Sequence, residues 1–336
     1  MLKPARYYET LHRDQLQCKL CPHHCTIGNG KTGICRIRKN EDGDLYLRTY
    51  GNVSSMGFDP IEKKPLYHFY PGSIIFSVGG FGCNLRCRFC QNYQISQDVP
   101  RKIELGRNYN PKEIVGLATE KKSNTGIAYT YNEPAIWFEF MMDIAELAQK
   151  KELKNVIVTN GFVNPEPLDE LIGVIDAFNV DLKAFTEDFY RTQTLSKLAP
   201  VKDSLKQISR SGRHLEITNL VIPGENDDRK VFEEMVKWIS GELGQNTVLH
   251  LSRYFPTYKM SAPPTPSKLI EELYLLAKTH LNYVYVGNMS SVNGQNTYCP
   301  SCGEKVIDRS RYDTWISGLD KEGKCNKCGF RVLENI

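Results

Sequence analysis

The middle of the chain alternates strand-like segments with amphipathic helical segments, and this alternation restricts the fold more than any other feature. The alternation occupies the stretch between Cys90 and Cys299, which contains no cysteine. Continuous apolar strands separated by helices predict a parallel sheet with right-handed crossovers. Six such units are too few for a closed eightfold barrel. The strand-like segments are rich in β-branched or aromatic residues. Six of them belong to these units, and a seventh at 283–287 extends the sheet. The six are 73–78, 126–131, 155–160, 177–182, 215–222 and 247–254.

Polar residues stand where these strands end. "YNEP" follows the second strand, "TNG" ends the third and "DLK" ends the fourth, while "IPG" and "HLSRYFP" mark the fifth and sixth. The first strand leads into a loop with three cysteines. In barrels of this kind the active site lies at the carboxyl ends of the strands. We therefore expect all these residues to meet at one end of the sheet.

Eleven cysteines are unusual in a chain whose other composition is ordinary, with 40% hydrophobic and 24% charged residues. The start has no signal-peptide core and no later run approaches a membrane span, so we expect a cytoplasmic protein without a membrane partner. In reducing cytosol, clustered cysteines more often hold metal than form disulfides. A net charge of +4 among 336 residues does not call for nucleic acid as a partner.

The cysteines form three groups, and these suggest three parts of the chain. An N-terminal metal-binding segment is expected at 1–65, an α/β core at 66–295 and a small C-terminal module at 296–336. The first and third groups each contain four cysteines, and the group that opens the core contains three.

Cys83, Cys87 and Cys90 have no spare cysteine to complete a four-thiolate site. A [4Fe–4S] cluster normally takes four thiolates, so three would leave one iron open. An open coordination position is what a catalytic metal needs. A zinc site completed by histidine and free thiols are the alternatives, and the polar residues at neighbouring strand ends argue against both.

The spacing C-x3-C-x2-C, with Phe89 before the last cysteine, resembles the cluster loop of radical S-adenosylmethionine (SAM) enzymes. The resemblance implies that SAM chelates the open iron and that the reduced cluster cleaves it to a 5′-deoxyadenosyl radical, which abstracts hydrogen. It also implies a low-potential electron donor as a partner. The core of that family is a partial (β/α)6 barrel, which agrees with the six units.

Within that family the core looks most like the activating enzymes of glycyl-radical enzymes such as pyruvate formate-lyase. The resemblance places Glu133 at the SAM amino group, although Tyr131 and Asn132 stand where two glycines are usual. The residues that it implies for SAM binding are Phe89, Gln91, Asn132, Glu133, Asn160, Asp181, Lys183 and His250.

Plainer interpretations of these residues stay open. Glu133 precedes a proline and can simply begin a helix, where a negative charge is favoured. Asp181 and Lys183 point the same way on a strand and can form an ion pair. Asn160 can be a turn residue before a glycine, and His250 can be a buried histidine with its hydrogen bonds satisfied.

Over its whole length the chain resembles the radical SAM member of the AmmeMemoRadiSam system. The stretches that carry this resemblance are 18–38, 60–73, 84–97, 129–134 and 251–260. It implies a Memo-type protein and an AMMECR1-type protein as partners. The stretch 60–73 has no mechanism that its residues reveal. Lys63, Lys64 and His68 can reach a substrate, but a structural linker with an aromatic face is the favoured interpretation.

The C-terminal module contains two C-x2-C pairs, each followed by a glycine that permits a tight turn. The pairs are Cys299 with Cys302 and Cys325 with Cys328. Zinc ribbons and rubredoxins share this pattern, and we favour zinc over iron. A closed four-thiolate zinc site has no open position, so we expect this module to be structural and separable from the radical chemistry.

The N-terminal pattern C-x2-C-x3-C-x9-C supplies four thiolates and is less familiar. Its members are Cys18, Cys21, Cys25 and Cys35. Zinc and an auxiliary iron–sulfur cluster fit it equally. His23 and His24 are alternative ligands, although solvent-facing positions are favoured for them.

Three functions follow from these features. The first is a radical SAM enzyme that acts on a partner protein or on a small molecule held by one. The second is activation of a glycyl-radical enzyme. The third, from another class, is nucleic-acid binding through the zinc ribbon, which the small net charge and the lack of a basic aromatic stripe disfavour.

Overall fold

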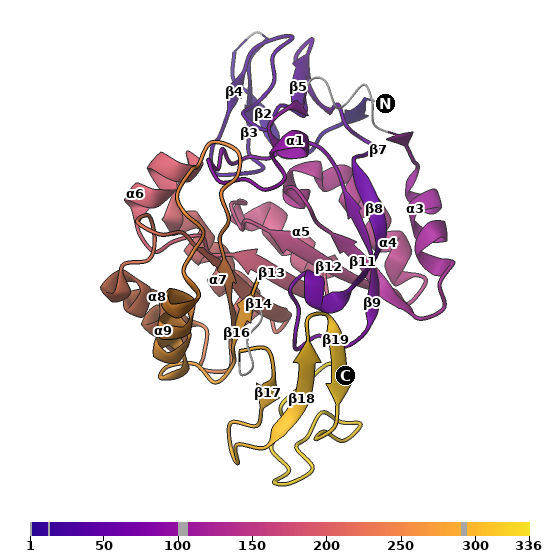
Figure 1. Ribbon diagram of the computed structural model, residues 1–336. Helices are drawn as coiled ribbons and strands as arrows, with labels where there is room; N and C mark the ends of the chain where they lie inside the picture. The colour runs from indigo at the N-terminus through magenta and orange to yellow at the C-terminus, as the bar shows by residue number, and fades with distance from the viewer. Residues whose placement is uncertain (1, 13, 100–106, 290–293) are drawn as a thin grey trace.

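The computed structural model describes residues 2–12, 14–99, 107–289 and 294–336, and an eight-stranded sheet forms its centre (Figure 1). Seven strands are parallel and lie beside one another in sequence order, and the eighth, β8, pairs antiparallel with the first of them. In spatial order the strands are β8 (Ser55–Pro60), β9 (Ile74–Gly79), β11 (Asn124–Tyr129), β12 (Lys154–Thr159), β13 (Ala177–Asp181), β14 (His214–Val221), β15 (Val248–Arg253) and β16 (Val284–Gly287).

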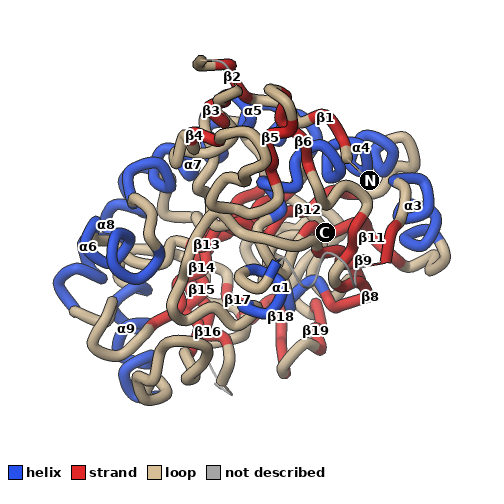
Figure 2. The backbone as a smooth tube through the Cα atoms, turned by 90° about the horizontal axis from the view of Figure 1, so that it is seen from above, coloured by secondary structure: helices blue, strands red, loops and turns tan. Residues whose placement is uncertain are grey.

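One long helix separates each consecutive pair of parallel strands, and Figure 2 shows the helices arranged around the strands. These helices are α3 (Pro111–Thr119), α4 (Phe138–Gln149), α5 (Pro165–Val174), α7 (Leu198–Arg210), α8 (Arg229–Glu242) and α9 (Ser267–Lys278). The edge strands β8 and β16 do not pair with each other in the described sheet, so the barrel is open. The predicted partial (β/α)6 barrel is confirmed, with 283–287 as its seventh parallel strand.

Shorter helical turns occupy the connections. They are η1 (Ile61–Lys63), α1 (Tyr93–Ser96), η2 (Pro134–Trp137), α6 (Glu187–Phe189) and the π-helical η3 (Tyr190–Thr194). Helix α3 begins with a complete capping box, because Asn110 accepts a hydrogen bond from the Glu113 amide and Glu113 accepts one from the Asn110 amide. No helix among the described residues is long and apolar enough to cross a membrane.

The N-terminal residues form small antiparallel sheets at one end of the core (Figure 1). One contains β1 (Lys3–Pro4), β6 (Asp44–Leu47) and β5 (Arg38–Glu41), and a second contains β2 (Tyr8–Thr10), β3 (Leu16–Cys18) and β4 (Thr26–Ile27). A third pairs β7 (Asn52–Val53) with β10 (Arg107–Asn108). Strand β8 also lies within 1–65 yet belongs to the central sheet, and the sequence analysis did not predict this strand.

The segment 60–73 packs beneath the amino ends of the barrel strands. The buried carboxylate of Glu216 accepts hydrogen bonds from the backbone amides of Tyr67 (2.9 Å) and His68 (2.7 Å). The amide of Asn179 donates to the Pro65 carbonyl at 2.7 Å. Lys64 is buried and pairs with Asp59 at 2.7 Å. These contacts support the structural interpretation of this segment.

The C-terminal module contains β17 (Thr297–Tyr298), β18 (Lys305–Ser310) and β19 (Asp313–Ile316), and it lies at the opposite end of the core from the N-terminal strands (Figure 1). It is attached to the segment 60–73. Arg309 donates to the Tyr67 carbonyl at 2.7 Å, and Thr314 donates to Glu62 at 2.8 Å. Its residues also share one buried apolar cluster with Tyr67 and Tyr285. The module therefore rests on the floor of the barrel.

Candidate active site

A cavity of about 230 Å³ lies at the carboxyl ends of the barrel strands. It is lined from the cysteine loop, from the connections after β11 and β12, and from strands β13 to β16. Ten of the residues predicted for the site line it: Cys83, Cys87, Phe89, Cys90, Gln91, Asn132, Glu133, Asn160, Asp181 and Lys183. The structure thus brings together residues that span 100 positions of the sequence, from Cys83 to Lys183.

Three glycines connect β9 to the cysteine loop, and other parts of the chain pack so closely against them that a side chain would not fit. A Cβ atom on Gly80 would lie 2.9 Å from the Trp137 ring, and Gly82 has a φ of +87° that favours glycine. Cys87 is buried and the other two cysteines of the loop are half-buried. Burial raises the pKa of Cys87 to about 12, so binding of a metal there must displace a proton.

The donor set of this cavity fits an iron–sulfur cluster. Its wall carries the three thiols of the loop, and no other cysteine of the described chain lines it. Thiolates are the ligands that such clusters take, and three of them leave one iron for a ligand that is not protein. The residues present therefore suit a [4Fe–4S] cluster with an open position.

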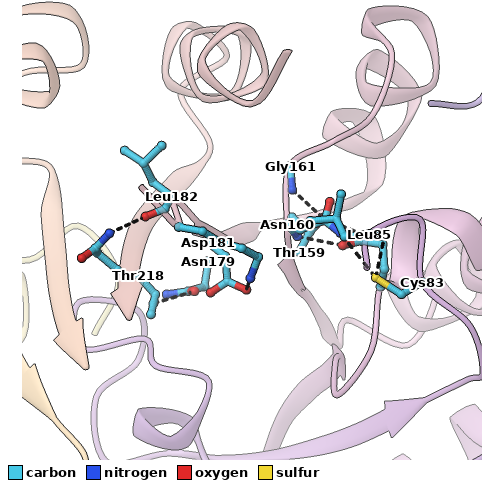
Figure 3. Close-up of polar contacts among 12 residues, drawn as sticks. Cys83, Leu85, Thr159, Asn160, Gly161, Asn179, Asp181, Leu182 and Thr218 are labelled. Atoms are coloured by element: carbon cyan, nitrogen blue, oxygen red, sulfur yellow. Dashed lines mark hydrogen bonds and ion pairs between the residues drawn. The ribbon is translucent and has the colours of Figure 1, made fainter. Parts of the chain in front are cut away.

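Asn160 directs its side-chain amide at the cysteine loop (Figure 3). Its Nδ2 atom lies 3.7 Å from the Sγ atom of Cys83 and 2.9 Å from the Oδ1 atom of Asn84. Its Oδ1 atom accepts the backbone N–H of Phe162 at 2.9 Å, which fixes the orientation of the amide. Asn160 therefore places a hydrogen-bond donor next to the sulfur of Cys83, in addition to its role in the turn.

Glu133 lies at the end of the second parallel strand and is 1% exposed. Its carboxylate accepts hydrogen bonds from the backbone N–H of Ala135 (3.0 Å), the hydroxyl of Thr159 (2.7 Å) and the backbone N–H of Asn160 (2.7 Å). It caps η2, as the plainer interpretation proposed, and also lines the cavity. Burial raises the pKa of Glu133 to about 7. A carboxylate has about four acceptor positions, so one remains for a ligand.

Tyr131 and Asn132 stand where the resemblance leads us to expect two glycines. Tyr131 takes a φ of +75°, a backbone conformation typical of glycine, and its hydroxyl donates to Asp59 at 2.9 Å. Asn132 donates to the Gly82 carbonyl at 2.8 Å, while its buried Oδ1 atom has no partner. A buried acceptor without a partner is costly. The free Oδ1 atom on the cavity wall therefore favours a ligand that carries N–H or O–H donors.

Asp181, which Figure 3 shows across from Asn160, ends β13, and Lys183 follows two positions later. Their side chains form an ion pair of 2.9 Å and both line the cavity. Burial opposes the charge on Lys183, but the carboxylate of Asp181 outweighs it, so the pKa of Lys183 is raised above its usual value. A fixed pair of opposite charges suits a zwitterionic ligand such as an amino acid group.

Phe89 and Gln91 flank the last cysteine of the loop. Phe89 is buried against Phe189, with 5.8 Å between ring centroids, and the Lys183 ammonium lies 5.9 Å from its ring centroid. Gln91 is exposed at the rim of the cavity. An aromatic wall and an amide at the rim can contact a flat heterocycle.

His250 is among the residues that the resemblance implies for SAM binding. It does not line the first cavity but lines a second cavity that adjoins the first. Its Nε2 atom lies 2.5 Å from the carboxylate of Glu216, and its ring packs on Tyr67 at 4.8 Å between centroids. Glu216 is buried and the two histidines bonded to it, His214 and His250, hold its pKa well below the usual value against the effect of burial. His250 is thus a buried histidine with a hydrogen-bond partner that also lines the second cavity, and its part in SAM binding stays a prediction.

Sequence reasoning missed several residues that line the cavity. They are Leu85, Asn92, Ser96, Tyr131, Thr218, Leu220, Ser252 and Asn288. Strand alternation offers a signal for one of them, because Ser252 lies two positions beyond His250 and therefore faces the same side of β15. The loop residues offer no such signal. Thr218 donates to Asn179 at 2.9 Å, which orients it within the sheet (Figure 3).

A second cavity, of about 370 Å³, adjoins the first. The two share Ser252 and Asn288 as lining residues. The second is also lined by Lys63 near β8, Gly287 at the end of β16, and Arg311 of the C-terminal module. It therefore lies at the seam between the two edge strands of the open barrel.

The other two cysteine sets lie outside these cavities. In the C-terminal module the four sulfurs are all within 4.8 Å of one another, with 3.5 Å between Cys299 and Cys328 and 3.7 Å between Cys302 and Cys325. Four thiolates at that spacing fit one tetrahedral ion. The N-terminal four, Cys18, Cys21, Cys25 and Cys35, line a separate small cavity.

Comparisons with known proteins agree with this geometry. Residues 77–239 match the model of the radical SAM superfamily. A pyruvate formate-lyase-activating enzyme of Listeria monocytogenes is 25% identical over 182 residues, which are 50% of this chain and 70% of that protein. The fold is similar to that of a radical SAM methyltransferase from Sphaerobacter thermophilus, with a TM-score of 0.51 and 16% identity over 85% of this chain and 76% of that one.

The chain belongs to the radical SAM superfamily, whose members are enzymes that catalyse radical reactions and use a [4Fe–4S] cluster with SAM. Within it, the chain is 41% identical over 334 residues to an uncharacterized protein of Methanocaldococcus jannaschii. That alignment covers 98% of this chain and 99% of the relative. The similarity therefore extends over the segments on both sides of the core.

Proposed function

We propose that this enzyme removes a hydrogen atom from a partner protein, or from a small molecule that a partner holds. The observation that carries the chemistry is the meeting of three thiols with Asn132, Glu133, Asp181 and Lys183 around one cavity. When bound, the reduced cluster and SAM supply a 5′-deoxyadenosyl radical that abstracts hydrogen. The chain supplies the ligands, the orientation and the shielding from water.

The polar residues of the cavity suit the two ends of SAM. The Oδ1 atom of Asn132 and the remaining acceptor position of Glu133 can take N–H donors from the SAM ammonium group. Lys183 can donate to its carboxylate, since its ammonium lines the cavity and lies 5.9 Å from the ring centroid of Phe89 in the cysteine loop. Phe89 and Gln91 border the space left for the adenine. His250 bonds to Glu216 through Nε2 and lines the adjoining second cavity, so it remains a candidate contact for SAM.

The second cavity is the place that we assign to the substrate. It shares Ser252 and Asn288 with the first, so a group bound there stands next to SAM. Its opening lies at the barrel seam and includes Arg311 from the C-terminal module. A loop or a small molecule presented by another protein can reach this seam without dismantling the barrel.

The resemblance to the AmmeMemoRadiSam system names the proposed partners. We propose that a Memo-type protein and an AMMECR1-type protein act with this enzyme, and that a low-potential electron donor reduces it. Cysteine-rich metal sites suit a reducing compartment, so we place the enzyme in the cytoplasm.

Anaerobic product analysis tests the proposal. Reduced enzyme is incubated with SAM, and 5′-deoxyadenosine and methionine are measured with and without each partner protein. We expect slow cleavage alone, faster cleavage with the true partner, and hydrogen transfer from a deuterated substrate into 5′-deoxyadenosine. Cleavage that no partner accelerates would contradict the role of partners and leave the SAM chemistry intact.

Activation of a glycyl-radical enzyme is the second candidate, and the relatives favour it. The Listeria monocytogenes protein named above aligns with half of this chain. In that case a partner with a C-terminal glycine loop gains a stable radical, and electron paramagnetic resonance detects it. The proposed zinc in the C-terminal module is structural in both candidates.

A further inference from the structure

The three cysteine sets of this chain differ in how far apart their sulfurs lie. In the C-terminal set all four sulfurs are within 4.8 Å of one another. In the other two sets, both of which are fully described, no three sulfurs approach one another that closely. The N-terminal set and the catalytic loop thus differ from the C-terminal module in forming no compact group of this kind.

This spacing distinguishes a single ion from a cluster. Four thiolates at about 2.3 Å from one tetrahedral zinc ion lie about 3.8 Å apart. The closest sulfur pairs of the C-terminal module, at 3.5 and 3.7 Å, match that separation. In a [4Fe–4S] cluster each thiolate binds a different iron, so the sulfurs stand farther apart. The catalytic loop, whose donor set fits a cluster, likewise forms no compact group of sulfurs.

The four N-terminal thiols surround a space of their own. Cys18, Cys21, Cys25 and Cys35 all line one cavity, and the other walls are mainly apolar, including Leu20, Ile27 and Ile136. His23 and His24 do not line it. His23 instead bonds to the Asn84 carbonyl at 2.8 Å, and His24 is exposed. The ligand set is therefore four thiolates without histidine.

A buried donor without a partner faces the same cavity. Arg38 is 1% exposed and lines the cavity, and its Nε atom has no hydrogen-bond partner. Its other nitrogens are occupied, because they bond to Glu139 at 2.8 and 3.2 Å and to the Arg6 carbonyl at 2.6 Å. A buried N–H without an acceptor is costly. A cluster, whose inorganic sulfides accept hydrogen bonds, would satisfy it.

We infer that Cys18, Cys21, Cys25 and Cys35 hold an auxiliary [4Fe–4S] cluster and that the C-terminal set alone holds zinc. With four thiolates the auxiliary cluster has no open iron, so it does not bind SAM. It stands next to the catalytic loop. A Cβ atom on Gly82 would lie 2.7 Å from the Cys35 carbonyl oxygen, and Arg86 bonds to the carbonyls of both Ile34 and Cys83. The protein thus places a second one-electron centre beside the catalytic one.

Metal and sulfide analysis of two proteins tests this inference. Wild type and the triple variant Cys83→Ala, Cys87→Ala, Cys90→Ala are made in medium containing both metals and purified anaerobically without reconstitution. For wild type we expect about eight irons, about eight acid-labile sulfides and about one zinc. For the triple variant we expect about four irons and four sulfides with the same zinc, and the spectrum of a [4Fe–4S] cluster.

The triple variant leaves the N-terminal thiols unchanged, so its result does not depend on how well an N-terminal variant folds. Cys25→Ser, which changes the least buried of the four, should in addition halve the iron of wild type and leave the zinc. Two zinc ions in the triple variant with no iron or sulfide would overturn the inference, and so would iron without sulfide. None of these counts depends on SAM cleavage, so a failure of the proposed function is distinguishable from a failure of this inference.

Discussion

The side-chain amide of Asn160 lies 3.7 Å from the sulfur of Cys83, and this contact joins the end of β12 to the cysteine loop. The Oδ1 atom of Asn160 is held by the Phe162 amide, so the Nδ2 atom must face the sulfur. Hydrogen bonds to ligand sulfurs help to set the reduction potential of iron–sulfur clusters. Asn160 is therefore in a position to tune the catalytic cluster.

Asn160→Ala should make the reduction potential of the catalytic cluster more negative, because it removes a donor that stabilises negative charge on the sulfur. The iron content of this cluster should stay as in wild type. A redox titration followed by electron paramagnetic resonance measures the shift. Asn164→Ala is the matched control, since Asn164 donates to the Lys19 carbonyl and does not line the cavity. An unchanged potential in Asn160→Ala would leave this asparagine as a turn residue only.

The triple replacement of Cys83, Cys87 and Cys90 by alanine should abolish SAM cleavage. The three thiols are the only cysteines among the described residues that line the active-site cavity, so the protein keeps no substitute ligand there. Anaerobic assay of 5′-deoxyadenosine checks the loss, and zinc analysis checks that the C-terminal site stays filled. Cleavage that survives the replacement would remove the basis for the proposed site.

Lys183→Met should weaken SAM binding without loss of the cluster. A lost charge-assisted hydrogen bond costs roughly 1.5–3 kcal/mol, which is about ten- to a hundredfold in affinity. Binding is measured anaerobically on protein with a verified iron content. Arg191→Met removes a cation from the exposed ion pair with Asp188, which does not line the cavity, and should bind SAM like wild type. Equal affinity in both variants would mean that SAM lies elsewhere.

Glu133 predicts a particular pH dependence of stability. Its pKa is about 7 in the folded protein because of burial, against an ordinary value of 4.5. Between these two values the folded state binds the extra proton, so stability falls as pH rises through this window and is constant above it. The shift corresponds to roughly 3 kcal/mol. Glu133→Gln should lose this dependence.

Denaturation of wild type and Glu133→Gln at several pH values between 5 and 8 checks this prediction, because other titrating groups cancel in the difference. The stability of wild type relative to the variant should decline with rising pH. SAM affinity should change in the opposite direction in wild type, since only the ionised carboxylate accepts a hydrogen bond from the SAM ammonium on its free position. A constant difference in stability would show that Glu133 is already ionised at pH 5.

The strands and their order could be predicted because their signal is local. Apolar runs such as Asn155–Thr159 need burial on both faces, and only a covered parallel sheet provides it. The meeting of Glu133, Asn160 and Lys183 followed from the same order, since parallel strands place their carboxyl ends together. Strand β8 gave no such signal, because Asp59 is its only buried residue and the strand includes glycine and proline.

The position of His250 could not be read from the sequence because it depends on a distant partner. Glu216 lies 34 residues away, and its hydrogen bond to the imidazole of His250 fixes the orientation of the ring. The same carboxylate also binds the amides of Tyr67 and His68, nearly 150 residues away. Only the fold shows the role of segment 60–73, which lies between the barrel and the C-terminal module and bonds to both.

The last prediction concerns that module, which supplies Arg311 to the second cavity, supplies no residue to the first, and is joined to the barrel. Cys302→Ser breaks a four-thiolate set in which its sulfur lies 3.7 Å from that of Cys325. Small zinc modules fold through the metal, so the variant should lose zinc and the order of β17–β19. SAM cleavage should persist, because the module supplies no residue to the active-site cavity.

The barrel itself should become less stable in Cys302→Ser. Loss of the module removes the hydrogen bonds from Arg309 to Tyr67 and from Thr314 to Glu62, worth about 1 kcal/mol each, and uncovers apolar surface around Tyr67. The barrel transition should therefore shift down by several degrees in a thermal scan. Lys305→Met, which removes only the exposed ion pair with Asp308 on the same strand, should keep both zinc and the transition. An unchanged barrel transition in zinc-free Cys302→Ser would mean that β17–β19 stay folded on the barrel without the metal. A red wild-type protein with iron in place of zinc would instead assign the module to electron transfer.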